Sequence, residues 1–152
     1  MATTDQILLF PGAVPPAFCE KIVQAGDALG VENSEIGFLR GQTQADQVRN
    51  SKVAFFQQAQ VENRWLFEEV FGIIQHANST NWNYQISGVE DLQYTVYGPG
   101  EYYGWHTDVN MPRRTADSQQ VVRKLSLTIQ LDLPDAYGGG DFEVRLAGSA
   151  KE

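Results

Sequence analysis

The stretch QYTVYGPGEYYGWHTD, residues 93–108, joins a β-prone run to a second aromatic run through a Gly-Pro-Gly turn. In an extended strand, side chains two positions apart project from the same face, so His106 and Asp108 can both reach one cation. An imidazole and a carboxylate are two of the three ligands in the 2-His-1-carboxylate arrangement that binds Fe(II). Taken alone, the tripeptide is a weak signal that more often marks a hydrogen-bonded histidine at a partly exposed strand end, so its surroundings decide.

A second informative stretch, RKLSLTIQLDLPDAYGGGDFEV, covers residues 123–144. Its alternation predicts a strand over residues 124–132, with Ser126, Thr128 and Gln130 on one face and apolar side chains on the other. A polar strand face indicates a wet cavity. The three glycines at 138–140 permit the positive φ values of a tight turn, after which residues 141–146 predict another strand.

The N-terminal half predicts two helices and two strands. The strands are expected at residues 7–10 and 48–57, and residues 82–87 add a further β-prone run. The first helix opens at Pro15-Pro16, and the second spans about residues 63–77. Their expected buried faces comprise Phe18, Ile22, Ala25 and Leu29 in the first helix, and Leu66, Val70, Ile73, Ile74 and Ala77 in the second. Helices followed by consecutive strands predict one α+β domain over residues 1–152.

Composition excludes several classes of protein. Hydrophobic residues make up 42% of the chain, enough for a core without disulfides. The net charge of −8 and the lack of a basic stripe argue against a nucleic-acid partner. Cys19 is the single cysteine, which fits a reducing cytoplasm. The N-terminus lacks a basic region and no segment reaches about 20 apolar residues, so we expect neither secretion nor a membrane partner.

Taken in order, the two stretches resemble the Fe(II)/2-oxoglutarate-dependent dioxygenase superfamily, particularly its prolyl-4-hydroxylase-like (PKHD-type) group, over about residues 85–145. The resemblance implies a double-stranded β-helix (jelly-roll) core supported by N-terminal helices. It also implies an oxidoreductase that uses Fe(II) and the cosubstrate 2-oxoglutarate, with ascorbate as an optional reductant. The reaction would hydroxylate a C–H bond of a small-molecule or peptide substrate, a peptidyl proline being one candidate.

The resemblance assigns roles to particular residues. His106 and Asp108 match the proximal iron ligands and are the implied catalytic residues. Tyr97 matches a tyrosine that lines the 2-oxoglutarate pocket, and Ser126 and Gln130 fall where the family places polar residues near the far end of 2-oxoglutarate.

Two aromatic residues flank the implied metal site. Tyr103 and Trp105 resemble positions that contact substrate, although packing at a barrel rim explains each equally well. Arg113, Arg114 and Arg123 could attract an anionic group, but a solvated loop and strand end are the simpler interpretation.

The family's distal histidine, and the Arg or Lys that follows it, have no counterpart in the chain. His76, the other histidine, lies near the end of the second predicted helix, where a surface position suits the helix dipole. We therefore expect a domain truncated before its last strands, with weak binding of Fe(II) and 2-oxoglutarate. An incomplete barrel exposes a sheet edge, which predicts a homo-oligomer.

Two other functions fit the same residues. A non-catalytic binding or assembly module could retain the oxygenase fold without turnover. A cupin-like metalloenzyme could use His106 and Asp108 with other partners, but cupin-type sites draw on several histidines. Halogenase chemistry is disfavoured because it needs a small residue in place of Asp108.

Overall fold

The computed structural model describes residues 3–4, 7–33, 49–108, 113–114 and 120–145. Its helices are α1 (Pro16–Leu29) and α3 (Arg64–Asn81), with 3-10 turns η1 (Val61–Asn63) and η2 (Pro134–Ala136). Its strands are β1 (Thr3–Thr4), β2 (Ile7–Leu8), β3 (Glu32–Asn33), β4 (Arg49–Asn50), β5 (Lys52–Phe56), β6 (Leu92–Val96), β7 (Tyr102–Tyr103), β8 (Arg113–Arg114) and β9 (Gln120–Val121). This mixture of helices and small antiparallel sheets confirms the α+β class.

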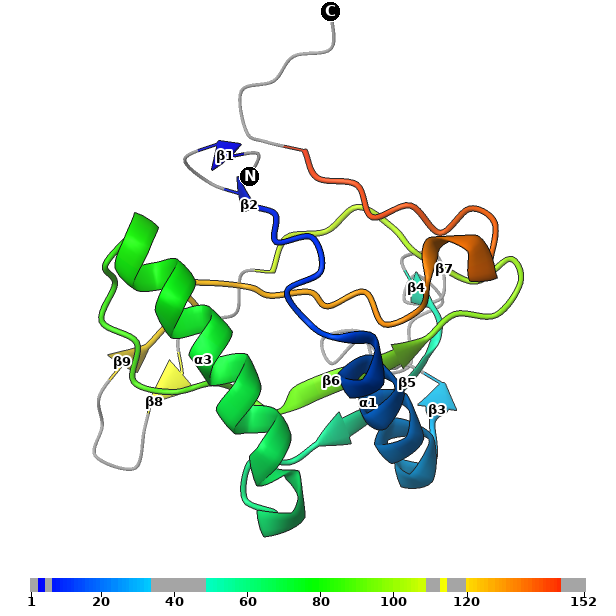
Figure 1. Cartoon of the computed structure of the whole chain (residues 1–152), viewed down its shortest axis with the longest axis horizontal. Helices are drawn as coiled ribbons and strands as arrows, with labels where there is room; N and C mark the ends of the chain where they lie inside the picture. The colour runs from blue at the N-terminus through cyan, green and yellow to red at the C-terminus, as the bar shows by residue number, and fades with distance from the viewer. Residues whose placement is uncertain (1–2, 5–6, 34–48, 109–112, 115–119, 146–152) are drawn as a thin grey trace, which may run out of the picture.

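The largest sheet has three antiparallel strands in the order β3, β5, β6. Five residue pairs join β5 to β6, among them Ala54↔Tyr94 and Phe56↔Leu92. Alternation along the strands turns these four side chains to one face, and α1 and α3 lie on that side of the sheet (Figure 1). The buried core unites both helices with both strands through Ile22, Ala54, Phe56, Leu66, Phe67, Val70 and Tyr94.

Helix α1 begins where the sequence predicts, because Pro16 occupies the first turn, whose N–H groups lack helical partners. It ends at Leu29, and the next residue, Gly30, has a φ of 76° that an L side chain rarely adopts. Ile22 is buried, and Phe18 and Ala25 pack against the core as expected. The prediction for Leu29 is wrong: its side chain is 42% exposed, because it occupies the last helical turn beside Gly30.

Helix α3 runs four residues beyond its predicted end, to Asn81. In the extra turn, polar side chains bond back to backbone carbonyls three or four residues earlier, in addition to the helical hydrogen bonds. Ser79 and Thr80 donate to the carbonyl of His76, at 3.1 and 2.8 Å, and Asn81 donates to that of Ala77, at 2.8 Å. The His76 side chain is exposed, as the sequence predicts.

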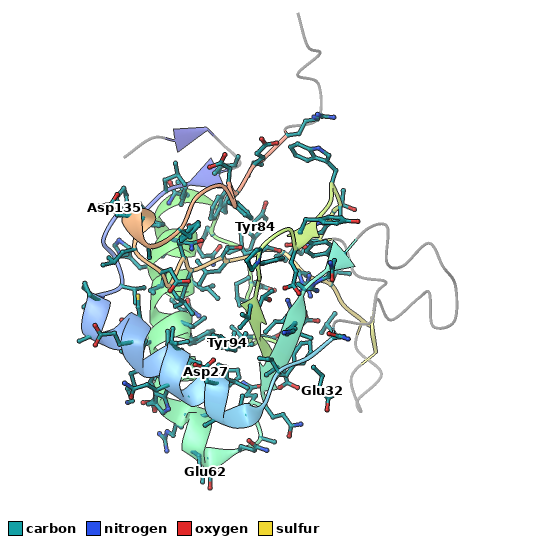
Figure 2. The ribbon with its side chains drawn as sticks, turned by 90° about the vertical axis from the view of Figure 1, so that its right-hand side faces the viewer. Asp27, Glu32, Glu62, Tyr84, Tyr94 and Asp135 are labelled. Atoms are coloured by element: carbon teal, nitrogen blue, oxygen red, sulfur yellow. The ribbon has the colours of Figure 1, made fainter. Side chains whose placement is uncertain are left out.

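A close contact fixes α1 against the sheet. A Cβ placed on Gly26 would lie 2.5 Å from the Tyr94 ring, so the helix backbone rests directly on that ring. The Tyr94 hydroxyl donates to Asp27 Oδ1 at 2.9 Å, and Figure 2 shows the two labelled side chains meeting between α1 and β6.

Three predicted strands are absent from the described chain. Residues 82–87, 124–132 and 141–145 are not paired as strands, so the described residues form no closed barrel. The alternation survives in part over 124–132: Leu125, Ile129 and Leu131 are partly buried while Ser126 and Gln130 are exposed. The prediction was wrong because alternation sets which face is buried, whereas a strand also requires a neighbouring backbone to bond with.

The strand predicted over 48–57 forms as two pieces, β4 and β5, on either side of Ser51. They belong to different sheets, since β4 pairs with β7 while β5 pairs with β3 and β6. Ser51 therefore separates β5, in the main sheet, from β4. Strand β4 pairs with β7, next to the candidate site.

Candidate metal site

The strand before the His-x-Asp motif is placed by a turn and by β4. Gly98 and Glu101 close the turn, because the Glu101 N–H donates to the Gly98 carbonyl at 3.0 Å and the Glu101 carboxylate accepts from the Gly98 N–H at 2.7 Å. Gly100 has a φ of 79°, as position i+2 of a type II turn after proline requires. The register then sets Arg49 opposite Tyr103.

His106 is held in one orientation by two contacts. Its Nδ1 lies 2.8 Å from the Gly104 carbonyl oxygen, which can only accept a hydrogen bond, so Nδ1 carries the proton. Its ring stacks on Tyr103, with centroids 3.7 Å apart and an interplanar angle of 12°. In the neutral imidazole, Nε2 then has a lone pair that can bind a metal. A metal-binding histidine usually has this arrangement, with its other ring nitrogen bonded to a backbone carbonyl or carboxylate.

Asp108 lies beside His106 Nε2. Its Oδ1 is 3.3 Å from His106 Nε2. Two cis ligands about 2.1 Å from an octahedral cation are about 3.0 Å apart, so the donors fit two corners of such a site. Without a cation or a proton between them, two lone-pair acceptors at this distance repel. The geometry therefore calls for either a bound metal or an imidazolium–carboxylate pair.

The part of the chain that the structure describes provides no third side-chain ligand to this pair. Within the described ranges, no group of three His, Cys, Asp or Glu side chains gathers in metal-binding geometry. The side chains of His106 and Asp108 are 35% and 52% exposed. Two surface hollows, of about 280 and 410 Å³, lie along α3, and neither includes His106 or Asp108. The described residues therefore supply two ligands, His106 and Asp108, to a metal at this site.

An arginine and two tyrosines adjoin the pair. The Arg49 guanidinium lies 4.4 Å from the Tyr103 ring centroid, on the ring that also stacks on His106. Arg49 is aligned by Ser51 Oγ at 2.8 Å and Thr95 Oγ1 at 3.3 Å. Burial raises the pKa of the Tyr97 phenol, and Arg49, which hydrogen-bonds that phenol, opposes the rise. Tyr97 and Tyr103 therefore belong to one cluster beside the candidate ligands.

The other predicted site residues lie apart from this cluster. Ser126 and Gln130 are exposed on residues 122–133, and no hydrogen bond or ion pair between described residues joins them to His106 or Asp108. Trp105 is 56% exposed and carries the Arg145 guanidinium 4.5 Å from its ring centroid. Of the predicted site residues, Asp108 and Tyr103 contact His106, and Tyr97 is linked to them through Arg49.

Sequence reasoning missed Arg49 and Glu90, and it treated Arg123 as a solvated strand end. Arg49 reaches the site only through the pairing of β4 with β7, more than 50 residues away along the chain. Arg123 forms an ion pair with Glu90 and donates to the Asp108 carbonyl. No local pattern signals such contacts, because they depend on how distant segments meet.

No protein-family model, curated protein or solved structure matches the chain significantly. Among the described residues, neither helix has the length and apolar content needed to cross a membrane. The functional interpretation therefore rests on the residues and geometry of the candidate site.

Proposed function

We propose that the protein is an oxidoreductase of the Fe(II)/2-oxoglutarate-dependent dioxygenase type, with a jelly-roll-related core, that hydroxylates a C–H bond. One observation carries the proposal: His106 Nε2 and Asp108 Oδ1 converge at 3.3 Å while Nδ1 is committed to the Gly104 carbonyl. That arrangement presents one neutral nitrogen and one carboxylate oxygen to a shared cation, as two ligands of a facial triad do.

Each neighbouring residue has a role in this proposal. His106 and Asp108 hold Fe(II), and Tyr103 fixes the plane of the imidazole by stacking. Tyr97 is the candidate cosubstrate contact, with Arg49 orienting its phenol. Ser126 and Gln130 remain candidate cosubstrate contacts and Trp105 a candidate substrate contact. Fe(II) with 2-oxoglutarate and O₂ would supply the oxidising chemistry, and the protein would contribute orientation of the bound groups.

The test is release of succinate from 2-oxoglutarate by the purified chain with Fe(II) and ascorbate. His106→Ala and Asp108→Ala should reduce release to the level without protein, because each removes one of two protein ligands. His76→Ala is the matched control, since it removes the other histidine from the exposed face of α3. Equal release by all three variants would contradict the proposal.

A second candidate function is a non-catalytic binding or assembly module. The exposure of His106 and Asp108 favours it, because an oxidising site benefits from excluding water and this pair lies open to solvent. Such a module would release no succinate even when 2-oxoglutarate and Fe(II) are saturating. The same assay therefore separates the two functions.

A further inference from the structure

We infer that Arg123 is a positioning residue that holds Asp108 in place for metal binding, with Glu90 as its anchor. The inference rests on the proposed metal site and adds to it a residue that contacts neither the metal nor the substrate. Its basis is a chain of polar contacts joining three segments: the loop before β6, the candidate ligand Asp108, and the chain after β9.

The Arg123 guanidinium donates hydrogen bonds to two partners, the Glu90 carboxylate and the Asp108 backbone carbonyl. Its Nε donates to Glu90 Oε2 at 3.1 Å, and a terminal nitrogen donates to the same oxygen. The other terminal nitrogen donates to the Asp108 backbone carbonyl at 3.2 Å. The carboxylate thus fixes the plane of the guanidinium, and the remaining donor is directed at the ligand's own backbone.

The bond between Arg123 and Asp108 joins residues that lie before β8 and after β9 along the chain. After Asp108 the chain proceeds to β8, which pairs with β9, and Arg123 follows β9 by two residues. The bond between Arg123 and the Asp108 carbonyl therefore connects the two ends of the segment that contains β8 and β9. Glu90 lies two residues before β6. Strand β6 belongs to the main sheet, where five residue pairs join it to β5. We call the contacts of Arg123 with Glu90 and with the Asp108 carbonyl the clamp. Through Glu90, the clamp connects Asp108 to the most extensively paired strands, β5 and β6.

Holding the backbone of Asp108 matters because its side chain is half exposed and its carboxylate touches only His106 among the described ion pairs. A ligand whose backbone must be ordered when the metal binds loses conformational entropy at that step, which weakens binding. Partners that orient a ligand typically contribute about 10- to 100-fold to metal affinity. Arginine suits this role better than lysine, because its planar fork serves two acceptors at once.

The experiment measures Mn(II) binding to the full chain by electron paramagnetic resonance, with Mn(II) alone as the probe, and amide hydrogen exchange of the metal-free chain. Arg123→Gln should weaken Mn(II) binding about tenfold and speed exchange in residues 104–108, leaving β5 and β6 unchanged. Arg123→Lys should fall between, since one ammonium cannot serve both acceptors in the same geometry. Arg64→Gln is the control, because it breaks another exposed Arg–Glu pair, with Glu68 on α3.

A reversed pair separates the two contacts. The double variant Glu90→Arg/Arg123→Glu can restore the ion pair but places a carboxylate, which cannot donate, beside the Asp108 carbonyl. It should remain as weak in Mn(II) binding as Arg123→Gln. Full recovery by the reversed pair, or normal Mn(II) binding and exchange in Arg123→Gln, would overturn the inference.

The metal-free readout keeps this inference distinct from the proposed function. If the wild-type chain binds no Mn(II), the proposed metal site fails and the positioning role for metal binding fails with it. Faster exchange in Arg123→Gln would then show a clamp on residues 104–108 that serves the fold alone. If wild type binds Mn(II) and Arg123→Gln binds equally well, only the inference about Arg123 fails.

Discussion

Tyr94 joins the sheet to helix α1 through a side chain that is almost completely buried. Burial, followed by the hydrogen bond to Asp27, raises the pKa of its phenol to about 12. The folded chain therefore keeps this proton between pH 10 and 12 while the unfolded chain loses it, so stability should fall as pH rises through this range. In Tyr94→Phe we expect a shallower alkaline loss in urea titrations, and about 1 kcal/mol lower stability at pH 7.

Tyr84→Phe is the control for this measurement, since the ring that faces Lys124 is retained. An alkaline loss in Tyr94→Phe as steep as that of wild type would show that another group titrates. Tyr97 also has a raised pKa, so the remaining slope in Tyr94→Phe should be small but not zero.

At the candidate site, the sequence predicts contacts between residues close in the chain, but it does not predict contacts between residues far apart in the chain. The two-residue spacing of His106 and Asp108 keeps them close along the chain, and in the structure they lie 3.3 Å apart although neither belongs to a strand. Tyr103 was identified as a neighbour, but its stacking on His106 depends on the backbone turning at Gly104, which no propensity predicts. The contacts of Arg123 were not predictable, because the residues it touches are 15 and 33 positions away.

Helix α1 packs so tightly on β6 that one methyl group should disrupt it. Gly26→Ala would place a Cβ 2.5 Å from the Tyr94 ring, and we expect a loss of about 2 kcal/mol in the free energy of unfolding. Gly72→Ala on α3 is the matched control, since nothing lies within 4 Å of its added Cβ. There, helix propensity should raise stability by about 1 kcal/mol. Equal effects at both positions would contradict this account of the packing.

The helices and the two central strands were predictable because their signals are periodic and their burial is one-sided. Residues 52–56 and 92–96 form strands within β-prone stretches of the sequence, and both helices begin within a residue of the prediction. The strands predicted beyond Asp108 were not found, because strand formation depends on a partner that alternation does not specify. The end of α3 was also missed, since Ser, Thr and Asn usually favour turns over helix interiors.

The whole molecule exposes several large apolar side chains in its C-terminal part. Leu133 is 66% exposed and Phe142 70%, and no described strand covers the free side of β6. Despite the net charge of −8, we expect self-association that grows with concentration. Sedimentation velocity over a concentration series measures it. Leu133→Ser/Phe142→Ser should shift the distribution toward monomer.

Val61→Ser is the control for self-association, because Val61 is 74% exposed on η1, at the start of α3. It should leave the association unchanged. A wild-type chain that sediments as a single monomeric species at every concentration would contradict this prediction.

The measurement closest to the central claim is the visible charge-transfer absorption of a 2-oxo acid chelated to protein-bound Fe(II), recorded without oxygen. If His106 and Asp108 bind the metal, adding Fe(II) and 2-oxoglutarate to the wild-type chain or to His76→Ala should produce the band. The same additions to His106→Ala or Asp108→Ala should not. Absence of the band in wild type, or its persistence in both ligand variants, would contradict the account.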